Sequence, residues 1–232
     1  MRPARAELDT GPGPAYLSAV YPITLKLGGR KCVVVGGGAV AARKVEALLA
    51  AGATVVVVTP ELCEALAARK AAGEIEHRGK RFEPEDLDGA LLAVAATDAP
   101  EVNAAVSQAA DARGILVNVV DRPELCSFFV PAVVRRGDLT IAISTGARSP
   151  TLARRIREEL EDQYGSEYAA FVELLGEMRP RVMAAVPSEA DRRRVWREML
   201  ASNALELLAA GHTDAARQTL EAVLSRFSGA KT

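Results

Sequence analysis

The segment that is most informative about the architecture of this chain is Lys31-Cys-Val-Val-Val-Gly-Gly-Gly-Ala-Val-Ala-Ala-Arg-Lys44. An apolar run from Cys32 to Val35 meets three glycines and then a helical pattern, which predicts a buried strand, a tight turn and a helix start. The order Gly36-x-Gly38-x-x-Ala41 fits the dinucleotide-binding fingerprint, with alanine as the third small residue. The first glycine permits the turn, the second lets the backbone approach a pyrophosphate, and the alanine lets helix and strand pack closely.

The residues that follow complete a βαβ unit. Arg43 to Ala51 has a helical pattern, Gly52 is a helix stop, and Thr54 to Thr59 is a β-branched run typical of a second buried strand. A strand, turn, helix and strand within about 30 residues is the size of such a unit. The free N–H groups at the helix start predict a phosphate site, with Ala39 and Val40 as backbone donors. A βαβ unit that binds no nucleotide is the less favoured alternative.

Composition narrows the class of protein. The chain has 232 residues, of which 49% are hydrophobic and 25% charged, and its net charge is −1. The charge gives no case for a nucleic-acid partner, and no apolar stretch approaches the roughly 20 residues of a membrane span. Three widely spaced cysteines predict reduced thiols and a cytoplasmic location. Two histidines exclude a multi-histidine metal site, and no metal ligand is predicted. Residues 1–20 are expected to form a flexible tail without the features of a signal peptide.

Alternating apolar runs and helical patterns predict an α/β fold with a Rossmann-like, doubly wound parallel sheet over residues 21–130. Further strands are expected at 74–78, 91–96 and 115–120, with helices at 60–72 and 100–113 between them. Such sheets bind ligands at the carboxyl ends of their strands. The cofactor-binding candidates are therefore Gly36, Gly38, Ala39, Val40, Ala41, Pro60, Glu61, Thr97 and Asp98.

Two of these strand ends leave alternatives open. An acidic residue usually ends the second strand and binds the adenosine ribose, but here Thr59 and Pro60 stand there and Glu61 is the first acid. Because Thr59 and Pro60 carry no positive charge for a 2′-phosphate, the sequence mildly favours NAD over NADP. Asp98 is better interpreted as a helix N-cap before Pro100 than as a cofactor ligand.

After residue 130 the pattern changes to a hairpin followed by helices. Apolar segments at 128–134 and 139–144 flank Gly137, which predicts a turn between two strands. Ser149 is the expected N-cap of the next helix, with Pro150 in its first turn. Residues 131–165 are expected to form a linking region and residues 166–232 a C-terminal helical domain. The expected helices span 150–164, 167–179, 188–201, 204–210 and 213–227, with breaks at Pro180, Pro187 and Gly211.

Several motifs together resemble the precorrin-2 dehydrogenase family, the siroheme synthase N-terminal type. They lie in order between Tyr21 and Leu200, and the most specific are Asn118-Val-Val-Asp121 and Ser144-Thr-Gly-Ala-Arg-Ser-Pro150. Members of this family oxidise precorrin-2 to sirohydrochlorin with NAD, and some also insert ferrous iron. The resemblance also implies a homodimer in which residues 131–165 are a dimerisation region that exchanges strands or helices.

By this resemblance Asp121 is the catalytic acid–base residue. The chemistry agrees, because the reaction removes a hydride and a proton, and a carboxylate at the mouth of a buried strand can lose hydration and gain basicity. An Asx turn before Arg122 is the alternative, and the residues alone favour it. Asn118 is a candidate for orienting the substrate, weighed evenly against a structural hydrogen bond at the edge of a turn.

Precorrin-2 is an octacarboxylate tetrapyrrole, so a locally basic binding site is expected. Residues 135–157 contain six arginines and a single acid, Asp138. The substrate-binding candidates here are Ser144, Thr145, Arg148, Ser149 and Arg154. Thr145 stands where some family members have a second serine, so a role that needs that serine is not transferred. A solvated helix face, balanced by the glutamates at 158, 159 and 161, is the alternative.

The sequence thus predicts NAD-dependent oxidation of precorrin-2 to sirohydrochlorin in siroheme biosynthesis, by a cytoplasmic homodimer. Three alternatives remain open at this point. The first is a bifunctional enzyme that is also a sirohydrochlorin ferrochelatase acting on ferrous iron. The second is a non-catalytic, NAD-sensing regulatory module, and the third is a different Rossmann oxidoreductase with an anionic substrate.

Overall fold

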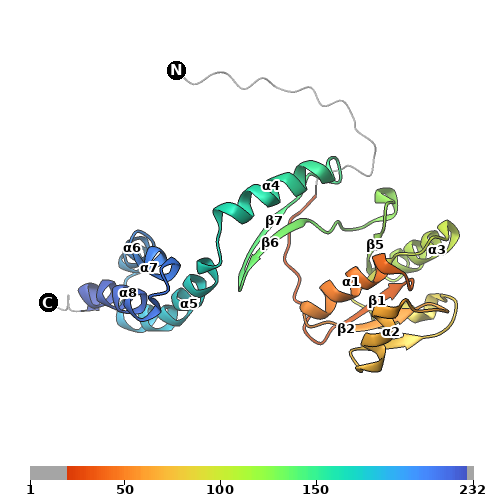
Figure 1. The fold of residues 1–232 in the computed structure, drawn as a ribbon, viewed down its shortest axis with the longest axis horizontal. Coiled ribbons are helices and arrows are strands. Elements are labelled where there is room, and N and C mark those ends of the chain that lie inside the picture. Colours follow the sequence, from red (N-terminus) through yellow and green to blue (C-terminus); the bar gives the residue numbers. More distant parts are fainter. Residues whose placement is uncertain (1–19, 229–232) are drawn as a thin grey trace, which may run out of the picture. The chain divides into compact units, whose positions relative to one another are not determined.

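A computed structural model describes residues 20–228 as two compact units (Figure 1). The first unit contains residues 20–130 with 146–148, and the second contains residues 131–145 with 149–228. Nearly all of the predicted N-terminal tail lies outside the described residues.

The first unit is a five-stranded parallel sheet with the strand order β3-β2-β1-β4-β5. This order confirms the predicted doubly wound fold, whose first strand lies at the centre of the sheet. Its elements are β1 (Lys31–Val35), α1 (Ala39–Ala50), β2 (Thr54–Val58), α2 (Glu64–Ala71), β3 (Ile75–Arg78), the 3-10 helix η2 (Pro84–Leu87), β4 (Leu92–Ala95), α3 (Pro100–Asp111), β5 (Leu116–Val119) and the 3-10 helix η3 (Pro123–Leu125).

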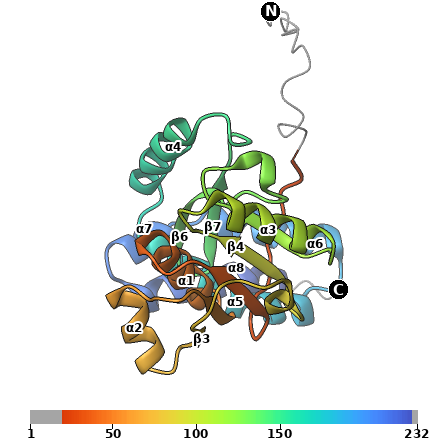
Figure 2. The same ribbon diagram turned by 90° about the vertical axis from the view of Figure 1, so that its right-hand side faces the viewer.

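Helices cover both faces of this sheet, and its three inner strands β1, β2 and β4 are accordingly apolar and buried over most of their length, whereas the edge strand β3 is polar. Alternation along β1 sends Cys32 and Val34 into one core, and Val33 and Val35 into the other. Helices α1 and α2 close the first core and α3 closes the second, on opposite sides of the sheet (Figure 2). Continuous β-branched runs suit strands that are buried on both faces.

Helix α2 begins at Glu64, four residues later than predicted. The preceding segment packs against the glycine turn instead of continuing the helix: the Cys63 N–H donates to the Gly37 carbonyl at 2.8 Å, and the Thr59 hydroxyl donates to the Glu61 carbonyl at 3.0 Å. These contacts use backbone groups that a helix would otherwise occupy. The prediction that a helix spans residues 60–63 was therefore wrong.

The second unit starts with the predicted hairpin and continues as helices. Strands β6 (Ala132–Arg136) and β7 (Leu139–Ile143) pair antiparallel around a turn in which Gly137 has φ 55°. Ser149 caps α4 by accepting the Leu152 N–H at 3.3 Å, as predicted, with Pro150 in the first turn. The helices are α4 (Pro150–Gln163), α5 (Glu167–Ala185), α6 (Glu189–Leu200), α7 (Ala204–Ala209) and α8 (Thr213–Ser228).

Pro180 does not end a helix, contrary to the prediction, because α5 runs through it to Ala185. The buried stripe of Phe171, Leu174, Met178 and Val182 continues past the proline into the helical core. Pro180 lies on the exposed side of α5, where water can bond the carbonyl that loses its partner. Packing of the apolar stripe therefore outweighs the local cost. The breaks predicted near Pro187 and Gly211 are confirmed.

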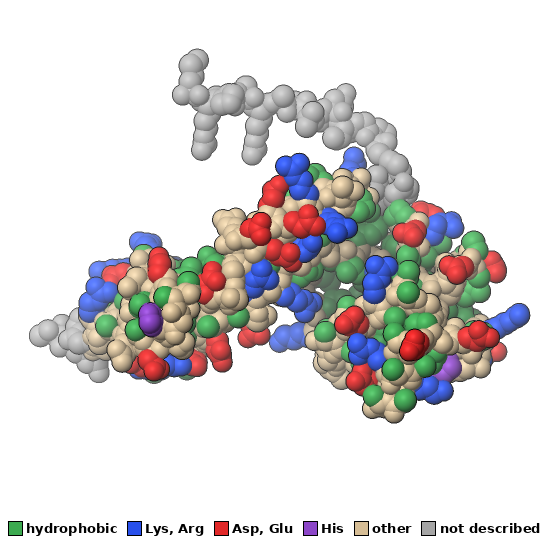
Figure 3. Space-filling model, viewed as in Figure 1, with side chains coloured by type: hydrophobic (Ala, Val, Ile, Leu, Met, Phe, Trp, Pro, Cys, Tyr) green, Lys and Arg blue, Asp and Glu red, His purple; other side chains and the backbone are tan. Residues whose placement is uncertain are grey.

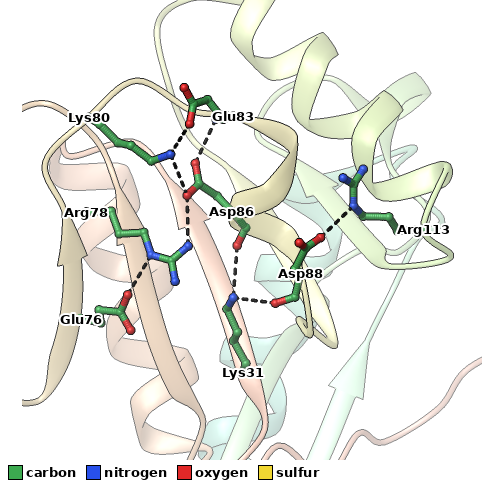
Figure 4. Close-up of polar contacts among 8 residues, drawn as sticks. All are labelled: Lys31, Glu76, Arg78, Lys80, Glu83, Asp86, Asp88 and Arg113. Atoms are coloured by element: carbon green, nitrogen blue, oxygen red, sulfur yellow. Dashed lines mark hydrogen bonds and ion pairs between the residues drawn. The ribbon is translucent and has the colours of Figure 1, made fainter.

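A buried carboxylate fixes the loop between β3 and η2 (Figure 4). Asp86 is only 2% exposed and accepts from the Glu83 N–H at 2.9 Å, from Arg78 at 3.0 Å and from Lys80 at 3.3 Å. Lys31 of β1 donates to the backbone carbonyls of Asp86 and Asp88. Burial opposes ionisation of Asp86, but the Glu83 N–H and the two cations outweigh it and hold the pKa of this carboxyl below its usual value.

Replacing Asp86 by asparagine should lower the free energy of unfolding by about 2–3 kcal/mol at neutral pH, because charge-assisted hydrogen bonds are lost at a buried position. The stability from ionised Asp86 is present above the ordinary carboxyl pKa of 3.8 and is lost as the pH falls through the lower folded-state value. Urea unfolding of both proteins across this range measures the difference. Asp88→Asn is the matched control, since its carboxylate is 68% exposed and pairs with Arg113 at 3.3 Å. Equal losses in the two variants would contradict the role of Asp86.

Candidate active site

A cleft of about 590 Å³ lies at the carboxyl edge of the parallel sheet. Most of the cofactor candidates predicted from the sequence line it: Gly36, Gly38, Ala39, Val40, Pro60, Thr97 and Asp98. Ala41 and Glu61 do not. Ala41 is fully buried in the core beneath α1, where it supports helix–strand packing, and Glu61 lies beside the glycine turn. The volume is in the range of small-molecule and cofactor sites.

The glycine turn has two kinds of position. A Cβ on Gly36 would lie 2.2 Å from the Ala96 carbonyl oxygen, and one on Gly37 would lie 1.9 Å from the Glu61 carbonyl oxygen. Both glycines therefore serve the fold. Gly38 differs, because a Cβ there meets no protein atom within 4 Å, although the residue lines the cleft and precedes α1. An open approach to a helix N-terminus is the cradle that a dinucleotide pyrophosphate requires.

Thr97, not Asp98, organises the start of α3. The Thr97 hydroxyl accepts the Ala99 N–H at 3.2 Å and lies 2.9 Å from the amide oxygen of Asn103, whose amide nitrogen donates to the Thr97 carbonyl at 2.9 Å. The N-cap position is Ala99. Asp98 is exposed at the cleft and is not the N-cap that the sequence favoured. Asn103 is a buried positioning residue that the sequence did not single out for this role.

One wall of the cleft was not predicted from the sequence: it is formed largely by the loop that follows β3. Lys80, Arg81 and Phe82 line it, as do Glu101 and Val102 of α3. The residues after β3 form no recognisable binding motif in the sequence. Only the strand order shows that the loop after β3 lies next to the end of β2. The ion pairs around Asp86 hold that loop (Figure 4).

Asp121 follows β5 in a left-handed turn, with φ 57°. Aspartate is among the few residues with a side chain that adopt this conformation readily. The Cys126 sulfur accepts the Val119 N–H at 3.2 Å, and its thiol hydrogen has the carbonyls of Val119 and Arg122 as acceptors, both at 3.3 Å. Both sides of the turn are thus tied to one side chain. Burial is the main cause that raises the pKa of the Cys126 thiol, which keeps it a neutral donor.

The Asn118 amide is used within the protein. Its nitrogen donates to the Phe128 carbonyl at 3.1 Å, so the side chain holds the returning segment against β5. Ser127 adds to this, because its N–H donates to the Val117 carbonyl and its hydroxyl accepts the Val117 N–H. These contacts match the structural alternative for Asn118, and a substrate-orienting role stays a prediction.

Charges in this turn influence the pKa of Lys44 in α1. Burial, together with Arg43, lowers the pKa of Lys44, while Cys126 and Asp121 oppose the shift by favouring its charged form. Lys44 is half-buried, whereas the Asp121 carboxylate is exposed. The loss of hydration expected for Asp121 does not come from the chain, so a bound substrate would have to supply it.

The remaining substrate candidates lie on or before α4. Arg154 pairs with Glu158 at 3.1 Å, and its neighbours on the helix pair with acids in the same way, so positive and negative side chains intermingle along α4 (Figure 3). Thr145 accepts the Ser149 N–H at 3.0 Å, which orders the turn before this helix. Arg148 has no ion pair within residues 20–228. Carboxylate binding by Ser144, Thr145, Arg148, Ser149 or Arg154 stays a prediction.

In residues 20–228 no group of three or more histidine, cysteine, aspartate or glutamate side chains could hold a metal ion. In the same range no helix is long and apolar enough to cross a membrane.

Gly38→Ala should separate ligand binding from folding. The added methyl group meets no protein atom, and Gly38 has φ −87°, so stability should change by less than about 1 kcal/mol. The methyl should nevertheless obstruct a pyrophosphate and raise the dissociation constant for NAD by about 10-fold or more, a cost of roughly 1.4 kcal/mol. Calorimetric titration and thermal unfolding measure the two effects.

Gly37→Ala is the contrasting variant, because its methyl group would collide with the Glu61 carbonyl. It should lower stability by about 1–3 kcal/mol. Unchanged NAD affinity in the folded Gly38→Ala protein would show that the turn does not hold a pyrophosphate.

Comparisons with known proteins cover nearly all of the described chain. Residues 23–132 match a family model of NAD(P)-binding domains, residues 136–163 the model of the central region of sirohaem biosynthesis proteins, and residues 167–224 that of the sirohaem synthase dimerisation region. The last match lies C-terminal to residues 131–165, where the resemblance had suggested dimerisation.

Individual relatives agree with these models. The siroheme synthase of Thioalkalivibrio sulfidiphilus is 44% identical over 88% of this chain and 42% of its own length, and that of Methylobacillus flagellatus is 45% identical over 88% and 44%. The chain thus spans less than half the length of these relatives. The solved structure of SirC, a precorrin-2 dehydrogenase, is 29% identical with a TM-score of 0.71, covering 88% of this chain and 100% of that one. The chain therefore belongs to the family of precorrin-2 dehydrogenases and siroheme synthase N-terminal regions, and its first unit is the NAD(P)-binding domain of that family.

Proposed function

We propose that this protein catalyses the NAD-dependent oxidation of precorrin-2 to sirohydrochlorin in siroheme biosynthesis. The observation that carries the proposal is the pairing of a nucleotide cradle with an exposed carboxylate on the same sheet edge. The cradle is the turn before α1, and Asp121 follows β5, whose neighbour β4 ends in the cleft. Family membership agrees with this arrangement, and SirC, which carries the name precorrin-2 dehydrogenase, has the same fold.

The residues of the cleft fit NAD. The open face of Gly38 and the free N–H groups at the start of α1 suit a pyrophosphate, and Thr97 and Asp98 lie where β4 ends. When bound, NAD supplies the acceptor for a hydride. The chain itself has to hold the substrate against that acceptor and take up the proton that leaves with the hydride.

Asp121 is the proposed acceptor of that proton. An Asx turn would use its carboxylate in a hydrogen bond to the local backbone, but among the contacts of residues 20–228 Asp121 makes no side-chain hydrogen bond. Cys126 and Ser127 hold the turn instead. The carboxylate is thus positioned by its neighbours while its oxygens stay available. A tetrapyrrole covering it would remove water and favour proton transfer.

Asp121→Asn tests this assignment, because asparagine also tolerates the left-handed conformation and keeps the turn. NADH formation with precorrin-2 generated in situ should fall by roughly 100-fold or more, since general base catalysis contributes about that much. NAD affinity should not change. Glu124→Gln removes a carboxylate three residues away that pairs with Arg122, and this control should keep its turnover.

Either of two results would contradict the proposal. Wild-type protein that binds NAD but forms no NADH would favour a sensing module or another substrate. Equal turnover in wild type and Asp121→Asn would keep the dehydrogenase and assign Asp121 to the turn alone.

We also propose that the protein acts as a homodimer in the cytoplasm. Residues 167–224 match the dimerisation region of sirohaem synthases, and a two-stranded sheet such as β6–β7 gains stability by further packing. The three cysteines are free thiols, as in a reducing compartment. Light scattering on the full chain should give twice the 24.5 kDa chain mass. A mass of one chain at micromolar concentration would exclude a stable dimer.

A further inference from the structure

We infer that the adenosine end of the cleft accepts a ribose 2′-phosphate through Arg81, so that the site takes NADP as well as NAD. The inference deepens the proposed function and rests on its nucleotide site. It starts from what stands at the end of β2. Rossmann domains that select NAD carry an acid there, which bonds the ribose hydroxyls and repels a phosphate. In this chain Thr59 and Pro60 line the cleft at that place, and Glu61 does not.

The loop after β3 brings two cations to the same end of the cleft. Lys80 and Arg81 both line it, and β3 is the strand next to β2. The acids of the cleft, Asp98 and Glu101, come instead from the end of β4 and the start of α3, on the far side of β1. Charge is therefore divided across the cleft, with the positive groups on the side of β2.

The two cations are not equivalent. Lys80 pairs with Glu83 at 2.5 Å and with the buried Asp86 at 3.3 Å, so its charge is already balanced (Figure 4). Arg81 is exposed and has no ion pair within residues 20–228. A guanidinium with free N–H groups can bind two phosphate oxygens at once. Arg81 is therefore the group that a 2′-phosphate would engage.

The neighbours of Arg81 hold it at the cleft. Lys80 is tied to Asp86, and the Lys80 N–H donates to the Arg78 carbonyl at 2.9 Å. On the other side Phe82 packs against the core beneath α3. Because both flanking residues are anchored, little backbone freedom has to be lost when the guanidinium binds an anion.

The test compares two probes that differ only in the 2′-phosphate: adenosine 2′,5′-bisphosphate and adenosine 5′-monophosphate. Calorimetric titration of the full chain should show the bisphosphate binding about 10-fold more tightly, the effect of one charge-assisted pair. Arg81→Ala should abolish this preference while leaving the monophosphate affinity within about 2-fold, since the residue is exposed and the fold does not need it. Arg81→Lys should restore part of the preference. Arg113→Ala, which removes an arginine that pairs with Asp88, should keep all of it.

Two results would overturn the inference. In the first, the wild type binds both probes equally. In the second, Arg81→Ala weakens both probes to the same extent, which would place the guanidinium at the 5′-phosphate. If neither probe nor NAD binds at all, the nucleotide site fails and the proposed function fails with it. Binding of NAD without a preference between the probes would reject only the present inference.

Discussion

The nucleotide-binding unit depends on one steric constraint, the absence of side chains at the turn between β1 and α1. The Ala96 carbonyl just after β4 and the Glu61 carbonyl before α2 both approach this turn so closely that a Cβ on Gly36 or Gly37 would overlap with them. The Cys63 N–H bonds the Gly37 carbonyl across the same gap. Three segments therefore converge where α1 begins, and their close approach turns the free N–H groups of its first residues toward the cleft. The fold therefore requires glycine at positions 36 and 37, and the ligand site uses the open approach that remains at Gly38.

Much of the fold could be predicted from the sequence because its signals are local. Buried parallel strands need continuous apolar runs such as Thr54–Val58, and the hairpin at Gly137 needs a residue that tolerates positive φ. The errors came from contacts between distant segments. The segment before α2 is held off the helix by the glycine turn, and α5 continues through Pro180 because its apolar stripe is packed against other helices. Neither contact can be read from the residues beside it.

The candidate site likewise combines features with a local sequence signal and features that depend on contacts between distant segments. The glycine turn and the ends of β2 and β4 were found because a fingerprint and strand ends mark them. Arg81 was not, because its contribution depends on the position of β3 beside β2 and on a buried carboxylate five residues further along. Thr97 and Asp98 were distinguished only by geometry, since either side chain could have capped α3. Sequence patterns thus located the cleft, whereas the polarity of its walls followed from the tertiary structure.

Asp121 is a residue for which both the sequence and the tertiary structure are needed. From the sequence, a turn and a catalytic carboxylate competed to explain it. The structure places the residue in a left-handed turn, a conformation that costs of order 1–3 kcal/mol for most residues with a side chain. Such a cost persists only where the surroundings fix the backbone, and here Cys126 fixes it from both sides. The turn itself would tolerate glycine or asparagine equally well, so the conformation alone does not call for a carboxylate. The backbone requirement and the proposed proton transfer are therefore complementary explanations of one residue: the first explains which residue types fit the turn, and the second explains why the one present carries a charge.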